Sequence, residues 1–337
     1  MPAEAELMMP GVLPAARFAS YAQNGEDVVL WRALRDVEAG RYIDVGANDP
    51  TIGSVSWAFY EQGWHGITVE PVHAYAQMHR QRRPRDILVE AAISSSRAES
   101  VTMFEIPDTG LSTLVDSIRD FQEHAGWQGR EVQVATRRLD DVLAEAGWHG
   151  CDIHFMVVDT EGAELDVLSS IDLRVWRPWV LVIEATLPNT TTPAYEEWEG
   201  IVLGADYVFC MFDGLSRYYV AREHADLAPR LSYPAGPLDA YTTVVERQLQ
   251  DDVARLTEDL RRATEDVVRW RAAALSGWTD AVASCTEVDE LRRELLAMRA
   301  TVSWRVTKPL RVVRERTQRS QTNDGTQPND GTQPNDG

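Results

Sequence analysis

The sequence predicts an α/β fold with a mostly parallel sheet, an antiparallel hairpin at its edge, and a C-terminal coiled-coil helix. Continuous apolar runs alternate with helical patterns up to about residue 240, which is typical of a parallel sheet covered on both faces. The last two apolar runs, 207–212 and 216–220, flank the turn Asp213-Gly214 and indicate a hairpin. From Leu249 onward, apolar residues recur at alternating spacings of four and three, as in a coiled coil.

The elements follow in order from these patterns. Glu26 and Asp27 begin a first helix, where acids suit the helix dipole. The strands expected in the α/β part cover 42–45, 66–70, 86–93, 101–104, 132–136, 153–159 and 179–184. The helices expected between them cover 54–62, 139–146, 198–203 and a segment after Glu164. Pro71 is expected to begin a further helix, at the position where its missing N–H is tolerated.

The chain of 337 residues divides into four predicted parts. They are a flexible leader (1–17), an α/β domain (18–242), a helical extension (243–317) and a disordered repeat tail (318–337) without apolar residues. The heptad pattern of the extension predicts a homo-oligomer. Two alternatives are a helix folded back on the domain and a helical hairpin that breaks at Gly277 or Ser284.

Composition excludes several classes of function. A net charge of −20 argues against nucleic-acid binding. The one lysine, Lys308, lies outside the α/β domain, and three scattered cysteines make no zinc or disulfide pattern. No apolar stretch reaches about 20 residues and no signal peptide is evident, so we expect a cytoplasmic protein. The basic, aromatic segment 303–311 predicts peripheral membrane contact, or simply a helix end.

Acidic residues mark the ends of four predicted strands: Asp44, Glu70, Asp159 and Glu184. In open α/β sheets a ligand binds beyond the carboxyl ends of the strands. A carboxylate beside an apolar core needs a partner because its desolvation is unfavourable. Any one of these acids could cap a helix, but the four together indicate a ligand site.

The turn Gly46-Ala47-Asn48 restricts the ligand. It lacks the G-x-G-x-x-G fingerprint of dinucleotide sites, and the chain has no P-loop. A glycine turn between two acids suits a ligand with an ammonium group, a ribose diol and no phosphate. Asp44 would face the ammonium and Glu70 the ribose hydroxyls, which favours S-adenosylmethionine over NAD. The predicted cofactor-binding residues are Gln23, Asp44, Gly46, Ala47, Asn48, Glu70, Pro71 and Ala91.

Several blocks, in order, resemble the FkbM family of methyltransferases over about residues 18–240. These blocks are Ser20–Asp27, Tyr42–Pro50, Gly63–Pro71, Leu111–Leu114, Val158–Glu164 and Asp213–Tyr219. His65 and Ser216 depart from the family pattern, where Arg and Asn are expected. The resemblance implies a class I Rossmann-like methyltransferase fold and S-adenosylmethionine-dependent O-methylation. It also implies acceptors such as sugars of glycans, glycosylated natural products or polyketides.

The predicted catalytic residues are Asp159, Glu161 and Glu184, with Asp159 or Glu161 as the base that deprotonates the acceptor hydroxyl. The same three carboxylates could instead hold a divalent metal ion. The segment of Gln23 and Glu26 is expected to cover the cofactor as a lid. The alternative function is a non-catalytic, methyltransferase-like scaffold whose coiled coil recruits partners in surface-glycan assembly. A nicotinamide dehydrogenase is a weaker alternative, because the glycine fingerprint is missing.

Overall fold

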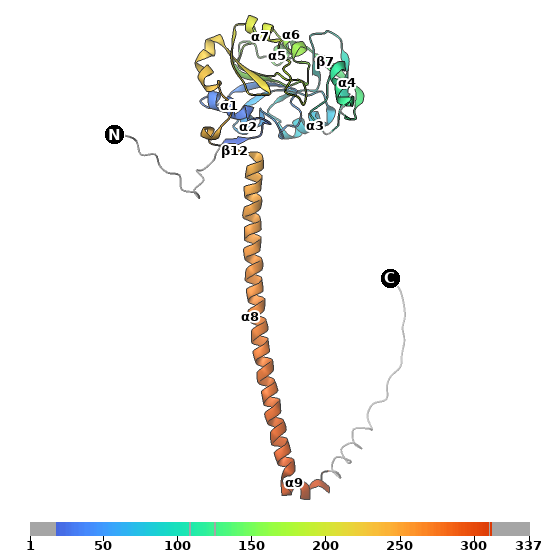
Figure 1. The fold of residues 1–337 in the computed structure, drawn as a ribbon, viewed down its shortest axis with the longest axis vertical. Helices are drawn as coiled ribbons and strands as arrows, with labels where there is room; N and C mark the ends of the chain where they lie inside the picture. The colour runs from blue at the N-terminus through green and yellow to red at the C-terminus, as the bar shows by residue number, and fades with distance from the viewer. Residues whose placement is uncertain (1–17, 108, 125, 310, 312–337) are drawn as a thin grey trace, which may run out of the picture. The chain divides into compact units, whose positions relative to one another are not determined.

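A computed structural model describes residues 18–107, 109–124, 126–309 and 311 (Figure 1). The chain divides into two units, 1–250 and 251–337. The predicted leader (1–17) and repeat tail (318–337) lie outside the described residues. The first unit holds the sheets and the second holds most of the long C-terminal helix.

A seven-stranded sheet forms the centre of the first unit, in the order β10-β11-β9-β8-β2-β3-β4. Its parallel strands are β2 (Arg41–Val45), β3 (His65–Val69), β4 (Ile87–Val89), β8 (Ile153–Val158) and β9 (Pro178–Glu184). The antiparallel strands are β10 (Tyr207–Phe212) and β11 (Ser216–Ala221). The strand order reverses between β2 and β8, which is where doubly wound folds bind ligands. The predicted α/β fold, with a mostly parallel sheet and an antiparallel hairpin at its edge, is confirmed.

Helices cover both faces of this sheet (Figure 1). One face packs against α1 (Glu26–Leu34) and α2 (Trp57–Glu61), and the other against α5 (Leu139–Glu145), α6 (Glu164–Ser169) and α7 (Glu199–Gly204). Helix α3 (His73–Arg82) lies between β3 and β4 in the chain. The alternation along β8 separates the two cores. Phe155 and Val157 join the core under α1 and α2, whereas Met156 and Val158 join the core under α5 to α7. Buried on both sides, β8 therefore appears in the sequence as one continuous apolar run.

The predicted strand over 86–93 is wrong as a single element. It forms β4 at the edge of the main sheet and β5 (Ala92–Ile93) in a second, three-stranded sheet with β6 (Ser100–Glu105) and β7 (Arg130–Arg137). Glu90 interrupts the run because its carboxylate turns outward to His73 and Arg80. The chain thus leaves the main sheet beside the end of β3.

Pro71 does not begin a helix, contrary to the prediction. Helix α3 starts at His73, and its N-cap residue Val72 is extended. The Val72 N–H donates to Glu70 Oε1 at 2.6 Å, so the side chain of Glu70 holds this segment as a turn. Helix α2 also begins later than predicted, at Trp57 rather than at residue 54.

Several short elements were not predicted. They are β1 (Phe18–Ser20) and β12 (Tyr241–Thr243), which pair in parallel, α4 (Asp116–His124), and the 3₁₀ segments η1 (Arg222–Arg230) and η2 (Pro237–Asp239). The C-terminal helices are α8 (Val244–Ala300) and α9 (Val302–Val306). Helix α8 continues unbroken through Gly277 and Ser284, so the helical hairpin does not form. Among the described residues, no helix has the length and apolarity needed to cross a membrane.

Candidate active site

The glycine turn after β2 is pressed against the end of β8. Gly46 has a φ of +83°, and a Cβ atom there would lie 1.7 Å from the carbonyl oxygen of Asp159. The N–H groups of Gly46 and Ala47 both donate to the carbonyl oxygen of Val69, each at 3.1 Å. Only glycine fits this position, and the contact brings the ends of β2, β3 and β8 together.

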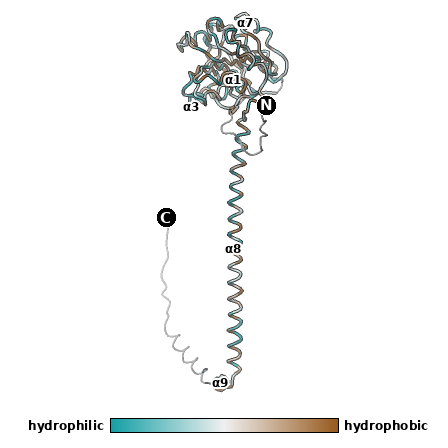
Figure 2. Tube along the Cα trace, turned by 90° about the vertical axis from the view of Figure 1, so that its left-hand side faces the viewer, coloured by the Kyte–Doolittle hydropathy of each residue, from teal (hydrophilic) through white to brown (hydrophobic). Residues whose placement is uncertain are grey.

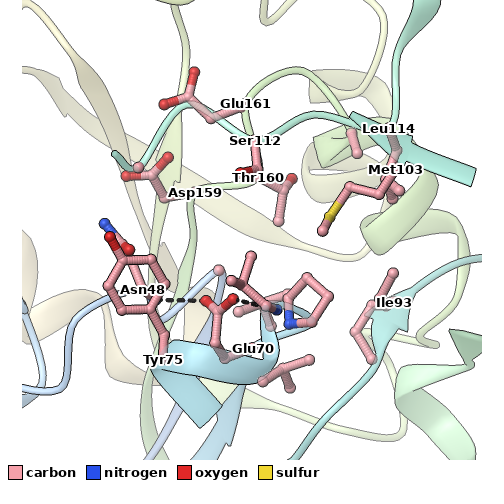
Figure 3. Close-up of a pocket in the computed structure, with 18 of the residues that line it drawn as sticks. Asn48, Glu70, Tyr75, Ile93, Met103, Ser112, Leu114, Asp159, Thr160 and Glu161 are labelled. Carbon is pink, nitrogen blue, oxygen red and sulfur yellow. Dashed lines mark hydrogen bonds between the residues drawn. The ribbon is translucent and has the colours of Figure 1, made fainter. Parts of the chain in front are cut away.

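Asn48 fixes the other half of the turn. Its backbone is left-handed, with a φ of +46°. Its N–H donates to Glu70 Oε2 at 2.8 Å (Figure 3), and His79 Nε2 donates to its carbonyl oxygen at 2.9 Å. Burial lowers the pKa of His79 to about 4, so the imidazole is neutral at pH 7 and this nitrogen carries the proton. The turn is therefore held from both sides before any ligand binds.

Both carboxylate oxygens of Glu70 accept backbone hydrogen bonds, from Asn48 and from Val72. The side chain is 3% exposed, and burial raises its pKa to about 7 against the effect of these two donors. A carboxylate oxygen can accept a second hydrogen bond, so ribose hydroxyls can still bind here. Glu70 thus has a structural role in the turn that was not predicted, and its contact with a ribose stays a prediction.

A first cavity of about 590 Å³ opens beside Glu70 (Figure 3). Its walls are largely apolar and come from the ends of β3, β5 and β6 and from the loop before α4. The residues that form these walls include Val72, Ala92, Ile93, Met103 and Leu114. A carboxylate at the edge of an apolar slot is a suitable environment for a nucleoside, with its ribose at Glu70 and its base among the apolar side chains.

A second cavity, also of about 590 Å³, lies on the other side of the glycine turn. Gln23, Asp44 and Ala47 line this cavity but not the first. The two cavities share Gly46, Asn48, Gly110, Asp159 and Glu161. They therefore meet around the turn, and a ligand longer than a nucleoside could extend from one into the other.

Asp44 reaches the second cavity from a buried position. Ser56 donates its hydroxyl hydrogen to Asp44 Oδ2, and Arg83 Nη2 in turn donates to Ser56 Oγ at 2.8 Å. Burial raises the pKa of Asp44, although the positive charge of Arg83 opposes this shift. Asp44 is thus positioned by a chain of hydrogen bonds that begins at a buried arginine.

Arg83 is 1% exposed and joins several segments. Its Nε donates to Asp86 at 2.7 Å and its Nη2 to Tyr42 Oη at 2.8 Å. Its Nη1 lies 3.3 Å from Ser54 Oγ. A buried charge needs such a set of partners, and the planar guanidinium has enough donors to reach them all.

Three carboxylates gather at the ends of β8 and β9. Asp159 directly follows β8, Glu184 is the last residue of β9, and Glu161 lies in the turn between β8 and α6. The side chain of Asp159 is open to the cavities, but protein atoms surround it on most sides, and this burial raises its pKa. Burial and the nearby acids raise the pKa of Glu161 and, most strongly, that of Glu184. A hydrogen bond joins the carboxyl groups of Glu184 and Asp159, so the two groups share one proton.

The turn that carries Glu161 is strained and tightly held. Glu161 has a φ of +50°, a left-handed conformation that is unfavourable for a residue with a side chain. Glu164 Oε1 accepts hydrogen bonds from Thr160 N, Thr160 Oγ1 and Gly162 N, at 3.1, 3.0 and 3.1 Å. Thr113 Oγ1 donates to the Glu161 carbonyl oxygen at 2.9 Å. This bracing holds the Glu161 backbone where both cavities meet.

The possible metal role of the three carboxylates has no support in the geometry. Within the described ranges, no group of three or more His, Cys, Asp or Glu side chains is arranged to hold a metal ion. Instead, two of the acids have a buried oxygen without a hydrogen-bond partner: Glu161 Oε2 and Glu184 Oε2. A proton on either oxygen would lessen the cost of burying a charge there.

The segment before α1 contributes Gln23 to the second cavity. The carboxylates of Glu26 and Asp27 bind this segment and do not simply cap the helix. Asp27 accepts hydrogen bonds from Ser20 Oγ at 2.8 Å and from Tyr21 N at 2.7 Å, and Glu26 accepts one from Asn24 N at 2.9 Å. The predicted lid thus lies beside the site, and its movement stays a prediction.

All the predicted cofactor residues line one of the two cavities, including Pro71 and Ala91 in the first. Asp159 and Glu161 line both, whereas Glu184 lines neither. One wall of the first cavity was not predicted; it is formed by Tyr75, Thr109, Gly110, Ser112 and Leu114. The block Leu111–Leu114, which carried part of the family resemblance, was the one signal for it.

The likeness of this chain to individual known proteins is distant. None of the curated proteins matches the sequence closely enough to be a relative. A solved structure of methyltransferase FkbM from Methylobacillus flagellatus is 14% identical and has a TM-score of 0.34, with 54% of this chain and 44% of that chain covered. The present chain thus spans less than half of that protein. A TehB-like SAM-dependent methyltransferase from Corynebacterium glutamicum is 10% identical, with a TM-score of 0.32 and coverages of 59% and 89%.

The family comparison covers the site itself. Residues 44–209 match the model of the Methyltransferase FkbM domain. This range begins at Asp44 and includes the glycine turn, Glu70, the loop 109–114 and all three clustered carboxylates. Residues 44–209 of this chain are therefore an FkbM methyltransferase domain.

Proposed function

We propose that this protein is an S-adenosylmethionine-dependent O-methyltransferase that modifies a hydroxyl group of a sugar, a glycan, or a glycosylated or polyketide natural product. One observation carries the proposal: two cavities meet at the glycine turn, with a nucleoside-type pocket on one side and a cluster of carboxylates on the other. The methyltransferase class follows from the family, and the acceptor class from the resemblance described above.

The residues present fit S-adenosylmethionine. Glu70 would accept the ribose hydroxyls, and Asp44 with Gln23 would face the amino-acid end. Among the residues that the structure describes, no Lys or Arg lines either cavity, which suits a cofactor with a positive sulfonium, a positive ammonium and no phosphate. When bound, S-adenosylmethionine supplies an electrophilic methyl group.

The carboxylate cluster would deprotonate the acceptor. A sugar hydroxyl is weakly acidic and needs a base at the moment of transfer. With S-adenosylmethionine bound, the acceptor oxygen would take the methyl group while the sulfonium sulfur keeps the electron pair of the broken S–C bond. A carboxylate oxygen of the cluster would accept the proton that the hydroxyl group loses. Asp159 is the best candidate, because it is open to both cavities and Glu184 holds the shared proton. Glu161, braced in its strained turn, would position the acceptor hydroxyl.

The negative charge of the two cavities restricts which chemical groups the acceptor can carry next to its reacting hydroxyl. Asp44, Glu70, Asp159 and Glu161 line the cavities without a facing cation. A phosphate or carboxylate next to these groups would be repelled. The acceptor group near the methyl donor is therefore a neutral hydroxyl, or one next to a positive charge.

If the protein is instead a non-catalytic scaffold, it does not need to bind S-adenosylmethionine. Isothermal titration of the full chain with S-adenosylmethionine separates the two functions first. Transfer of a deuterated methyl group onto neutral glycans and polyketides, read by mass spectrometry, then tests the acceptor class. Binding in the micromolar range with transfer to a hydroxyl supports the proposal. No binding would leave the scaffold as the better explanation, and transfer to nitrogen or carbon would disprove O-methylation.

A further inference from the structure

Helix α8 exposes an apolar stripe along its length. It spans 57 residues, none of which is buried. Figure 2 shows hydrophobic residues recurring along it among hydrophilic ones. Large side chains such as Leu256, Leu260 and Leu291 are 62%, 68% and 58% exposed. A regular exposed stripe of this kind marks an interaction surface, because water is an unfavourable neighbour for so much apolar area.

The stripe follows one heptad register without interruption. The a positions are Val253, Leu260, Val267, Ala274, Ala281, Val288 and Leu295. The d positions are Leu249, Leu256, Ala263, Trp270, Gly277, Ser284, Leu291 and Met298. Valine at several a positions together with leucine at d favours a parallel, two-stranded coiled coil. Small residues between Ala274 and Ser284 weaken the middle, so the two ends contribute most of the packing.

The charged residues on both sides of the stripe indicate which partner binds it. The g positions are acidic at Asp252, Asp259, Asp266, Asp280, Glu287 and Glu294. The charged e positions are all arginines: Arg271, Arg292 and Arg299. In a parallel, in-register pair, each g residue faces the e residue five positions later on the other helix. This arrangement pairs Asp266 with Arg271, Glu287 with Arg292, and Glu294 with Arg299 of the second copy.

In an antiparallel pair of α8 helices, residues of like charge would face each other. There g faces g and e faces e, so acids would meet acids and arginines would meet arginines. Other ion pairs, such as Arg261 with Glu258 and Glu265, lie on the outer face and stabilise the helix itself. We propose that α8 binds a second copy of this chain as a parallel, in-register coiled coil. Its charge pattern complements itself in that orientation only.

Association is tested on the full chain by sedimentation equilibrium at micromolar concentration. The expected mass is twice the 37.8 kDa of one chain. Val288 and Val282 form a matched pair, because both are 50% exposed but only Val288 lies in the stripe. Val288→Glu should raise the dissociation constant at least 100-fold, whereas Val282→Glu should leave it within about threefold. A monomeric wild type, or equal effects of the two variants, would overturn the proposal.

Orientation is tested separately. Met298→Cys, combined with Cys285→Ser, should give a disulfide-linked dimer on oxidation, because d residues face their own copies in a parallel pair. Ala297→Cys in the same background lies on the outer face and should stay monomeric on a non-reducing gel. Reversing the g charges with Asp266→Arg, Glu287→Arg and Glu294→Arg should weaken the dimer. Adding Arg271→Glu, Arg292→Glu and Arg299→Glu should restore it. An antiparallel dimer would show neither the crosslink nor the restoration.

Discussion

The carboxylates at the two ends of the site differ in their hydrogen bonding. At the nucleoside end, both oxygens of Glu70 already accept backbone hydrogen bonds. At the other end, Glu161 and Glu184 each have a buried oxygen with no hydrogen-bond partner among the described residues. The first arrangement stabilises the glycine turn. The second leaves acidic groups whose proton affinity is raised, which is common where protons are transferred. Under the proposed function, the first part of the site would bind the cofactor and the second would carry out the chemistry.

The largest effect should come from Gly46, on which both ends depend. Gly46→Ala places a Cβ atom against the Asp159 carbonyl oxygen and forces a left-handed backbone. We expect it to lower the free energy of unfolding by more than about 4 kcal/mol and to abolish cofactor binding. Thermal unfolding and titration with S-adenosylmethionine measure both effects.

Gly53 provides the matched control. It has a φ of +72°, but nothing lies within 4 Å of an added Cβ atom. Gly53→Ala should therefore show only the left-handed backbone penalty of about 1 kcal/mol. If the two variants are equally stable, the contact between the turn and the end of β8 does not organise the site.

Asp159→Asn tests the carboxylate cluster at the ends of β8 and β9 without changing the residues around Glu70. Loss of the general base should lower turnover about 10²- to 10⁴-fold, while the dissociation constant for S-adenosylmethionine changes by less than about threefold. Glu184→Gln, which keeps a hydrogen-bond donor beside Asp159, should be milder. Rates with the acceptor found in the methyl-transfer screen give this comparison. Full turnover in Asp159→Asn would exclude it as the base.

Glu70→Gln tests the binding end. An amide cannot accept from both Asn48 and Val72 as a carboxylate does, and its NH₂ group would face a donor. We expect cofactor affinity to fall about 10- to 100-fold, equivalent to roughly 1.4–2.8 kcal/mol. Glu90→Gln, at the protein surface, should leave affinity unchanged. An unaltered affinity in Glu70→Gln would mean that the nucleoside binds elsewhere.

The smallest effect is a dependence on pH. Burial raises the pKa of Glu70 to about 7 and that of Glu26 to about 8, from ordinary values near 4.5. The folded protein therefore binds these protons more tightly than the unfolded chain. This contribution to stability is complete below about pH 4.5 and is lost as the pH rises to about 8. The cofactor-free protein should lose stability over that range.

Binding of a cationic cofactor should offset this loss, because it favours the charged carboxylates. The thermal shift caused by S-adenosylmethionine should thus increase between pH 5.5 and 8. Unfolding midpoints measured with and without the cofactor, in wild type and Glu70→Gln, give the test. A thermal shift that is constant with pH would show that these acids do not respond to the cofactor.

Much of the site followed from local sequence. Apolar runs located the ends of β2, β8 and β9, and parallel neighbours necessarily bring Asp44, Asp159 and Glu184 to one edge of the sheet. Periodicity could not show that the run 86–93 turns at Glu90, because its apolar residues are continuous through two strands. It also could not identify the wall at Thr109–Leu114, which lies in a loop without a regular pattern.

The hydrogen bonds between distant segments were also beyond the sequence. Arg83 looked like one of several basic residues at the end of α3, and nothing near it in the chain indicates burial. Its partners Tyr42, Ser56 and Asp86 come from three separate segments. Such a contact becomes visible only when the strands and helices are assembled.

The buried Arg83 side chain also restricts how this protein can change over generations. Lysine, the usual replacement for arginine, has three donors on one nitrogen and no planar fork. It could not reach Asp86, Tyr42 and Ser56 together. A change at this position would therefore alter the stability of the fold and the position of Asp44 at once. The stability of the fold and the geometry of the site therefore depend here on the same guanidinium group, and neither can change without the other.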